Sequence, residues 1–300
     1  MQLENVKLNL ETELVLNIGC PIGKTNAPRV YNKLFEVLDM NAIMLPAEIQ
    51  KGKLPELLDA CKTLDIHYLC PTMPHKADII PLLDDVDDVS KLFRSVNAVR
   101  IDQEGVSHGV GMDGKGAVRA MVNGGAQLDG VTAMIYGAGS ISGVIGYELS
   151  KQNVKRLYIA NRSREKAESI ARILKENTPM EVQVIDCEPG VLNRAAEECE
   201  LLANLTPLGM AGYPYKHDYL GFIDRMPKTA AVFDCIINPP QSETIQAAQK
   251  NGLLTIPGMQ MLVSQMDVIF DFMFGVQLKE EHKEACLAEL CNYLGVQRQA

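Results

Sequence analysis

The chain has 300 residues, of which 47% are hydrophobic and 22% charged, a composition that indicates a globular protein and excludes a disordered or fibrous one. Its formal charge is −9, and no cluster of Lys and Arg indicates a nucleic-acid surface. No apolar run approaches the ~20 residues of a membrane-spanning helix, and the first residues lack the basic and apolar regions of a signal peptide. We therefore expect a cytoplasmic protein of two domains that acts on small molecules.

The eight cysteines include no Cys-x-x-Cys pair, and most of them lie in apolar stretches. This pattern predicts reduced, buried thiols rather than disulfides. The five histidines never approach a cysteine pair at the spacing of zinc ligands, so we expect no metal site.

The first part of the chain alternates apolar strands with segments of helical period, which is typical of α/β proteins built on parallel sheets. Strands are predicted at Glu13–Gly19, Ala42–Ile49 and Ile66–Thr72, with helices near Arg29–Leu38 and Leu54–Leu64. Two further β-rich runs, Ser95–Ile101 and Gly105–Gly111, flank turn-forming residues and predict a hairpin. We expect this first domain to close near residue 117.

A glycine-rich stop, Asn123-Gly124-Gly125, follows a helix predicted at Gly114–Val122 and suits a domain boundary. Further strands are predicted at Val131–Tyr136, Arg156–Ala160, Glu181–Asp186, Leu201–Leu205, Ala230–Ile236 and Leu254–Ile256, with helices between them. Met259–Phe274 and Glu280–Leu294 are predicted as two amphipathic helices that pack back onto the first domain. The chain would then cross between its domains twice.

The second domain opens with a strand, the motif Gly137-x-Gly139-x-x-Ser142 and a helix. Glycines in this place permit a tight turn and let backbone N–H groups approach a pyrophosphate, which predicts a Rossmann dinucleotide-binding domain. Ser142 replaces the usual third glycine but is small enough for close packing of helix and strand. The alternative is a tight turn that binds nothing.

The end of the next strand indicates which dinucleotide binds. An NAD site usually has Asp or Glu there, whereas this chain has Asn161-Arg162-Ser163-Arg164 followed by Lys166. A guanidinium can bind the 2′-phosphate of NADP, which a carboxylate would repel. The sequence therefore favours NADP, with the alternative that Arg162 and Arg164 are only solvated charges at a helix start.

Lys76 ends the segment Cys70-Pro71-Thr72-Met73-Pro74-His75-Lys76, which follows a predicted strand at the place where open α/β sheets bind ligands. Two prolines restrict this backbone, so Thr72 and Lys76 are held in defined positions. Asp113 lies in a glycine-flanked stretch between the hairpin and a helix, where it could also serve as an N-cap. Most lysines are solvated surface groups, and that is the alternative for Lys76.

Several motifs, taken in their order and spacing, resemble those of the shikimate/quinate dehydrogenases across nearly the whole chain. They are Gly19-Cys20-Pro21-Ile22 with Pro28 and Asn32, Thr72-x-Pro74-x-Lys76, Val96-Asn97-Ala98, Asp113-Gly114-x-Gly116, Gly137-Ala138-Gly139, Asn161-Arg162-Ser163, Asn204-x-Thr206-Pro207-x-Gly209-Met210 and Gly258-x-x-Met261-Leu262-x-x-Gln265.

This resemblance implies NADP-linked oxidation of a ring hydroxyl, or the reverse reduction, in the biosynthesis of chorismate and aromatic amino acids. It implies Lys76 and Asp113 as the catalytic pair, and Thr25, Thr72, Asn97 and Gln265 as substrate-binding residues. The implied cofactor-binding residues are Gly137, Ala138, Gly139, Ser140, Asn161, Arg162, Ser163, Thr206, Gly209, Met210 and Gly258. The fold implied is a substrate domain of residues 1–117 and 258–300, a Rossmann domain of residues 118–257 and a cleft between them.

Several substrate-side positions depart from the family pattern. Ala27, Cys70 and Gly111 stand where the family usually has Ser, Asn and Asn, and Ile237 stands where it has Tyr. Losing a hydrogen bond to a charged group costs about 1.5–3 kcal/mol, which can change the substrate without abolishing the chemistry. Lys24 could contact a substrate carboxylate instead, or it could be an ordinary solvated lysine.

The substrate therefore stays open between shikimate, which we favour, and quinate or another carboxylated cyclic polyol. A non-catalytic NADP-binding sensor is disfavoured by the presence of both Lys76 and Asp113. A folate-linked dehydrogenase shares a two-domain layout and a catalytic lysine, but the motifs of Asp113 and Gln265 fit it less well. A homodimer would be the commonest assembly for such an enzyme, and we expect no nucleic-acid or membrane partner.

Overall fold

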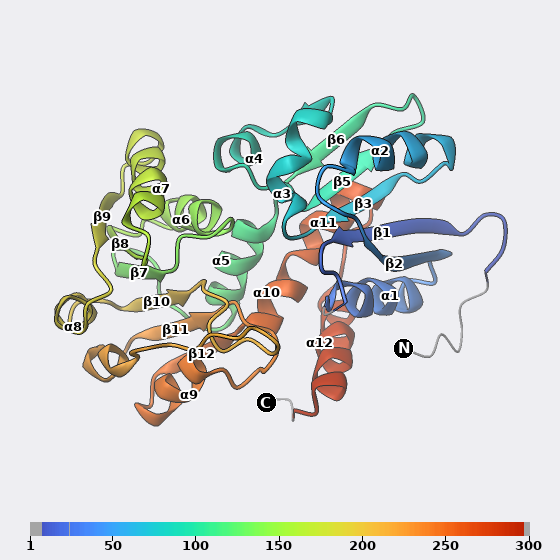
Figure 1. The fold of residues 1–300 in the computed structure, drawn as a ribbon. Coiled ribbons are helices and arrows are strands. Elements are labelled where there is room, and N and C mark those ends of the chain that lie inside the picture. The colour runs from blue at the N-terminus through green and yellow to red at the C-terminus, as the bar shows by residue number, and fades with distance from the viewer. Residues whose placement is uncertain (1–7, 24, 297–300) are drawn as a thin grey trace. The chain divides into compact units, whose positions relative to one another are not determined.

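The computed structural model describes residues 8–23 and 25–296, so Lys24 lies outside the described residues (Figure 1). The chain forms two compact units. The first comprises the residues up to Met112 together with those from Gln265 onward, and the second runs from Asp113 to Ser264. The chain thus passes between the units twice. Which unit binds which ligand stays a prediction at this point.

The first unit contains a mixed six-stranded sheet in the order β2-β1-β3-β5-β6-β4. Its strands are β1 (Glu13–Gly19), β2 (Ala42–Glu48), β3 (Tyr68–Pro71), β4 (Asp85–Val86), β5 (Ala98–Ile101) and β6 (Ser107–Val110). β1 pairs in parallel with β2 and β3, whereas β5 runs antiparallel to both β3 and β6. The hairpin prediction is confirmed. The hairpin reverses the chain direction, so this sheet is mixed, whereas the crossover units predicted before it are parallel.

Helices cover both faces of this first sheet. They are α1 (Ala27–Val37), α2 (Leu54–Thr63), α3 (His75–Asp78), α4 (Asp88–Phe93), α11 (Met266–Phe274) and α12 (Glu280–Leu294), with a 3-10 turn, η1 (Ile80–Leu82). Leu54 and Leu58 of α2 pack with Ile18 and Leu69 of the sheet in one apolar core. α12 lies beside α1, where Arg29 stacks on the Tyr293 ring, as predicted for a last helix that packs back onto the first domain (Figure 1).

The segment predicted as one helix, Met259–Phe274, is two helices. α10 (Gly258–Ser264) belongs to the second unit and α11 to the first, and Gln265 lies between them outside either helix. Apolar periodicity continues through both helices, which is why the pattern did not reveal the break.

The second unit is a doubly wound, fully parallel sheet in the order β12-β11-β10-β7-β8-β9. Its strands are β7 (Thr132–Tyr136), β8 (Arg156–Ala160), β9 (Glu181–Ile185), β10 (Leu201–Asn204), β11 (Ala231–Asp234) and β12 (Leu254–Pro257). The strand order reverses between β7 and β10. Ligands of such sheets bind at this switch point, beyond the carboxyl ends of the strands. The predicted Rossmann fold is confirmed.

The helices of the second unit are α5 (Asp113–Asn123), α6 (Ser142–Ser150), α7 (Arg164–Asn177), α8 (Pro189–Ala196), α9 (Glu243–Lys250) and α10, with a 3-10 segment, η2 (Gly221–Arg225). Leu192 of α8, Phe222 of η2 and Ala248 of α9 share a core with Tyr158 of β8. The side chain of Leu157 lies on the opposite face of β8, where it packs close to Gly146 of α6. No helix among the described residues is long and apolar enough to cross a membrane.

Candidate active site and cofactor turn

The turn after β7 has a backbone that only glycine adopts readily. Gly137 has φ +115, and a Cβ on it would lie 2.9 Å from Cγ2 of Thr206 and 3.1 Å from the carbonyl carbon of Leu205. β7 and β10 are neighbours in the sheet, so this contact lies at the switch point. The predicted turn is therefore placed where the fold binds ligands.

Ser142 has a role that the sequence did not reveal. Its Oγ donates to the carbonyl of Gly137 at 2.9 Å and accepts from the N–H of Gly139 at 3.0 Å, so one hydroxyl ties both glycines of the motif together. The close packing of helix and strand that we attributed to Ser142 occurs instead at Gly146 of α6. A Cβ there would lie 2.8 Å from Leu174 of α7 and 3.2 Å from Leu157 of β8.

The turn leaves donors available for an anion. The N–H groups of Ser140 and Ile141 have no hydrogen-bond partner among the residues that the structure describes. They precede α6, and a Cβ on Gly139 would meet no atom within 4 Å. Free N–H groups at a helix N-terminus with open space beside them fit a pyrophosphate.

Asn161 links this turn to the end of β8. Its Oδ1 accepts from the N–H of Ala138 at 3.2 Å, and its Nδ2 donates to the carbonyl of Ser163 at 2.8 Å. The amide thus holds the Asn161–Ser163 turn beside the glycine turn. The two predicted cofactor segments are adjacent within one unit.

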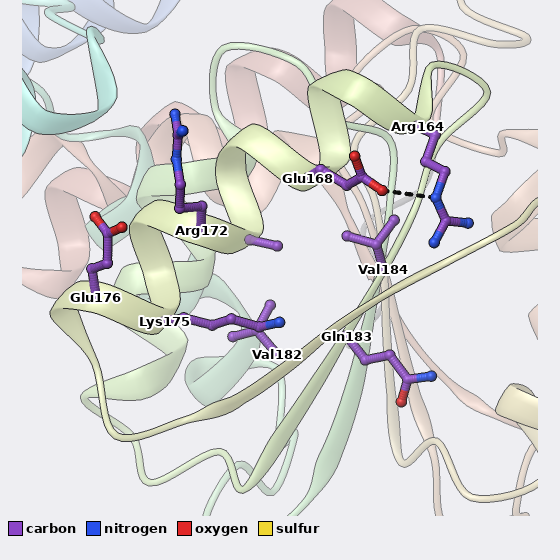
Figure 2. Close-up of a pocket in the computed structure, with 9 residues that line it drawn as sticks. Arg164, Glu168, Arg172, Lys175, Glu176, Val182, Gln183 and Val184 are labelled. Atoms are coloured by element: carbon purple, nitrogen blue, oxygen red, sulfur yellow. Dashed lines mark hydrogen bonds and ion pairs between the residues drawn. The ribbon is translucent and has the colours of Figure 1, made fainter.

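Of the two arginines in this turn, only Arg164 is held by carboxylates. Its Nε lies 2.8 Å from Glu168 and its Nη1 2.8 Å from Asp186. Figure 2 shows Arg164 at one end of a groove of about 690 Å³ between α7 and β9, joined there to Glu168. Arg162 is exposed and makes no ion pair among the described residues.

The charge of Arg162 acts on Tyr136, the last residue of β7. Burial raises the pKa of Tyr136 to about 12, while the nearby Arg162 guanidinium opposes that rise. Arg162 therefore lies close to the carboxyl end of β7, at the edge where such sheets bind ligands.

The loop after β10 holds the predicted residues Thr206, Gly209 and Met210. The N–H and hydroxyl of Thr206 both donate to Oδ1 of Asn204, at 3.2 and 2.8 Å. Gly209 has φ +83, and its N–H donates to the carbonyl of Tyr215 at 3.0 Å. Gly258 begins α10 and packs so tightly that a Cβ would lie 2.6 Å from the carbonyl of Cys235.

In the first unit, Lys76 is half-buried on α3. Its carbonyl accepts from the N–H of Val96 at 3.0 Å. Thr72 is fixed beyond the end of β3, since its N–H donates to the carbonyl of Ile18 at 2.8 Å and its carbonyl accepts from His75 at 2.8 Å. The restricted backbone predicted around Lys76 is therefore tied to two neighbouring segments.

Asn97 and Gln265 are 168 positions apart but contact each other inside the first unit. Nδ2 of Asn97 donates to Oε1 of Gln265 at 3.0 Å, and Oδ1 of Asn97 accepts from the N–H of Met112 at 2.8 Å. Both amides are buried, with exposed fractions of 8% and 7%. Two residues that the resemblance had implied separately thus form one polar pair.

Thr25 lies beside the end of β1. Its hydroxyl donates to Oδ1 of Asn17 at 2.7 Å, and the buried Asn17 amide donates to the carbonyl of Cys70 at 2.9 Å. Sequence reasoning missed Asn17, although a polar residue inside an apolar strand is a signal for such a contact.

Asp113 is the first residue of α5, is 5% exposed and belongs to the second unit, whereas Lys76 belongs to the first. Gly114 packs against α6, since a Cβ there would lie 2.6 Å from the carbonyl of Val144. Gly114, directly after Asp113, therefore allows α5 and α6 to pack closely. The pairing of Asp113 with Lys76 stays a prediction.

The comparisons decide the family. Residues 18–99 match the shikimate dehydrogenase substrate-binding domain, and residues 118–204 match the shikimate/quinate 5-dehydrogenase model. A curated relative, shikimate dehydrogenase (NADP(+)) of Alkaliphilus metalliredigens, is 31% identical over 92% of this chain and 96% of its own length. The chain belongs to the shikimate dehydrogenase family.

Solved structures agree with this family assignment. A shikimate dehydrogenase in complex with NADP⁺ is 28% identical, with a TM-score of 0.82 over 94% of this chain and 97% of its own. A ligand-free 5-ketofructose reductase of Gluconobacter sp. strain CHM43 is 23% identical, with a TM-score of 0.83 over 95% and 100%. The second likeness shows the fold alone.

Two departures from the family pattern have a local cause in the packing. Gly111 has no room for a side chain, because a Cβ would lie 2.0 Å from the carbonyl oxygen of Ser95. Cys70 is buried, and its Sγ donates to the hydroxyl of Tyr31 at 3.2 Å. Burial raises the pKa of the Cys70 thiol to about 12, so it acts as a packing residue.

The other two departures from the family pattern, Ala27 and Ile237, lie at the start of a helix and beyond the end of a strand. Ala27 is the first residue of α1, and its N–H lies 3.4 Å from Oγ1 of Thr25. Ile237 is half-buried beyond β11.

All eight cysteines are free, as predicted. Burial is confirmed for five of them, whereas Cys20, Cys187 and Cys235 are only half-buried. No group of three or more His, Cys, Asp and Glu side chains among the described residues could hold a metal ion.

Proposed function

We propose that this chain is an NADP-dependent shikimate dehydrogenase, which transfers a hydride reversibly between shikimate and NADP(H). The observation that carries the proposal is the relationship to the Alkaliphilus shikimate dehydrogenase (NADP(+)) over almost the full length of both chains. The glycine turn, with its free N–H groups at the start of α6, supports binding of a dinucleotide. The 28% identical structure that contains NADP⁺ supports the same cofactor.

Two proton-handling residues complete the chemistry. When bound, the nicotinamide accepts the hydride that leaves the alcohol carbon. The hydroxyl proton must leave at the same time, and we assign it to Nζ of Lys76, with Asp113 orienting the lysine and the hydroxyl. Asn97 supports this assignment, because it binds Met112, directly before Asp113, while the adjacent Val96 binds the carbonyl of Lys76.

We propose that the first unit binds the substrate. Asn97 and Gln265 would turn their paired amides to the ring hydroxyls, and Thr72 and Thr25 would add hydroxyl groups. A substrate group that is buried against these two amides must form hydrogen bonds with them, because an unpaired polar group is costly to bury. The pair would therefore favour substrates that have hydroxyls at fixed positions. Quinate or another carboxylated polyol is the second candidate. Ala27 keeps it open, because losing one hydroxyl of the family pattern can change which substrate binds.

The second unit would bind NADP, with the pyrophosphate on the glycine turn and the 2′-phosphate on Arg162. Thr206, Gly209, Met210 and Gly258 would lie on the nicotinamide side. We also propose a cytoplasmic location and, as the commonest assembly for such an enzyme, a homodimer.

The first prediction concerns Lys76. Wild-type protein should reduce NADP with shikimate, and Lys76→Ala should lower kcat by about 10²-fold or more, as expected for the loss of a general base. Lys51→Ala removes an exposed lysine of the same unit and should leave kcat unchanged. Steady-state kinetics with shikimate and with quinate, each with NADP and with NAD, gives kcat and KM for all four combinations of substrate and cofactor.

Each result has a distinct meaning. Equal turnover in wild type and Lys76→Ala would exclude Lys76 as the proton acceptor. Turnover of quinate in preference to shikimate would select the second candidate. Tight NADP binding without turnover of either substrate would indicate a sensor.

A further inference from the structure

A buried carboxylate in the second unit has no place in the proposed chemistry. Asp234 ends β11, has no exposed surface and has no cation among its contacts. Burial raises its pKa, and hydrogen bonds from Ser242, Ile236, Asn204 and Thr244 oppose that rise. A carboxylate is costly to bury unless its oxygens are fully hydrogen-bonded. We therefore expect Asp234 to have a role other than packing.

The donors around Asp234 leave its carboxylate little freedom. Its Oδ1 accepts from the N–H of Ile236 at 2.9 Å. Its Oδ2 accepts from Oγ of Ser242 at 2.6 Å and from Nδ2 of Asn204 at 3.1 Å. These three partners are all donors, and the Thr244 hydroxyl is a fourth, so the arrangement fits the ionised carboxylate.

The contact with Asn204 fixes the orientation of that amide. Nδ2 of Asn204 also donates to Oγ1 of Thr244 at 3.2 Å, which uses both of its hydrogens. Its Oδ1 must then face the other way, where it accepts from the N–H and the hydroxyl of Thr206. The carboxylate therefore determines, through one amide, where the loop after β10 begins.

The same loop is held at its far end. Oγ1 of Thr244 lies 3.4 Å from Nε2 of His217, and the His217 ring stacks on Tyr136 with the ring centroids 5.8 Å apart. Between these ends the loop is closed on itself, since the N–H of Gly209 donates to the carbonyl of Tyr215. Both ends of the segment from Thr206 to His217 are thus connected to Asp234 through hydrogen bonds. Thr206 is connected through Asn204, and His217 through Thr244.

We propose that Asp234 is a positioning residue for the cofactor: through Asn204 and Thr244 its carboxylate fixes both ends of the Thr206–His217 loop. This rests on the proposed function, which places Thr206, Gly209 and Met210 on the nicotinamide side. Thr206 also touches the glycine turn, because its Cγ2 would lie 2.9 Å from a Cβ on Gly137. The network therefore aligns the nicotinamide side with the turn that binds the pyrophosphate.

The isosteric variant Asp234→Asn tests the network at one contact. Its new amide can still accept from Ile236 and contact Ser242, but its N–H hydrogens would meet those of Asn204. Amide hydrogen exchange in residues 206–217 should accelerate by about tenfold or more, while exchange at Gly137 stays unchanged. kcat should fall about tenfold and KM for NADP should change less than about threefold, because the 2′-phosphate turn lies outside the network.

Two further variants separate positioning from simple stability. The double variant Asn204→Asp with Asp234→Asn restores one carboxylate and one amide in contact, so exchange and kcat should return to within about threefold of wild type. Ser242→Ala removes another hydrogen bond to the same carboxylate and the N-cap of α9. It should lower Tm without changing kcat or exchange in the loop.

Other outcomes would overturn the proposal. They are unchanged loop exchange in Asp234→Asn, a double variant no better than the single one, or an equal loss of kcat in Ser242→Ala. If Asp234→Asn does not fold, His217→Phe keeps the ring stack and removes the contact with Thr244 together with the hydrogen bond to the backbone of Leu208. Faster exchange near residue 217 is then expected, and unchanged exchange would refute the proposal. If wild type turns over neither shikimate nor quinate, the proposed function fails, while loop exchange still decides the role of Asp234.

Discussion

At the scale of single residues, the proposed preference for NADP rests on which arginine is available to bind a phosphate. Arg164 is occupied by Glu168 and Asp186, whereas Arg162 has no ion pair among the described residues. A hydrogen-bonded pair with a phosphate is worth about 1.5–3 kcal/mol, or roughly a 10- to 100-fold change in affinity. Arg162→Ala should therefore raise KM for NADP by about that factor and leave KM for NAD nearly unchanged.

Arg164→Ala is the matched control, because it removes the same charge two positions away. Exposed ion pairs contribute little, so KM for NADP should change less than about threefold. Steady-state kinetics with both cofactors measures the difference. Equal effects of the two substitutions would show that the 2′-phosphate is not bound by Arg162.

Gly111 allows a prediction about a departure from the family pattern. Gly111→Asn restores the usual family residue, but its Cβ would collide with the carbonyl of Ser95. We expect a loss of about 1–3 kcal/mol in the free energy of unfolding, as for other overpacked sites, and no gain of activity on shikimate. Urea unfolding measures the loss. Gly190→Ala is the control, since only the far end of Arg194 lies near that position, and it should not destabilise.

At the scale of elements, regular patterns could be predicted and long-range contacts could not. β1, β8 and α12 have the predicted bounds, because their apolar spacing is uninterrupted and turn residues flank them. β4 has only two residues and forms by pairing with β6. No local sequence pattern predicts such a short strand. The break at Gln265 arises from a change of unit, and local periodicity carries no information about it.

The same division applies to the site. The glycine turn was predictable, because a positive φ at Gly137 requires glycine and the strand and helix on either side are regular. The contact between Asn97 and Gln265 joins the two segments of the first unit, so only the resemblance could bring these residues together before the structure did. The motif Asn204-x-Thr206 marked one part of the Asp234 network in the sequence, but its contacts with Asp234 and Thr244 join separate chain segments and had no local signal.

The loop that ends at His217 gives a prediction about pH. Burial lowers the pKa of His217 below its ordinary value of 6.5, although the nearby carboxylates Asp234, Glu243 and Asp218 and a hydrogen bond with Leu208 oppose this. The unfolded chain therefore takes up the proton first as the pH falls. The stabilisation from neutral His217 is present above about pH 6.5 and is lost on acidification through the lower pKa of the folded state.

His217→Phe keeps the ring but cannot titrate, so its free energy of unfolding should fall less between about pH 7 and pH 5 than that of wild type. Urea unfolding at several pH values gives both curves, and the ionisable groups remote from His217 cancel in their difference. Parallel curves would contradict the expected titration of His217.

At the scale of the whole molecule, the two units differ in continuity. The first needs two separate parts of the chain, whereas the second is the continuous segment from Asp113 to Ser264 and contains all six strands of its sheet. The second unit has its own apolar core and the complete set of predicted NADP-binding residues. It should therefore fold and bind NADP alone, without dehydrogenase activity, because Lys76, Asn97 and Gln265 are absent from it.

Thermal unfolding of the fragment 113–264 tests this expectation. NADP at a hundred times its Kd should stabilise the fold by about 2.7 kcal/mol, which corresponds to a rise in Tm of roughly 5–10 °C for a domain of this size. NAD at the same concentration should raise Tm less, and Arg162→Ala in the fragment should remove the difference between the cofactors. A fragment that unfolds cooperatively but whose Tm does not respond to NADP would show that residues of the first unit are required for cofactor binding.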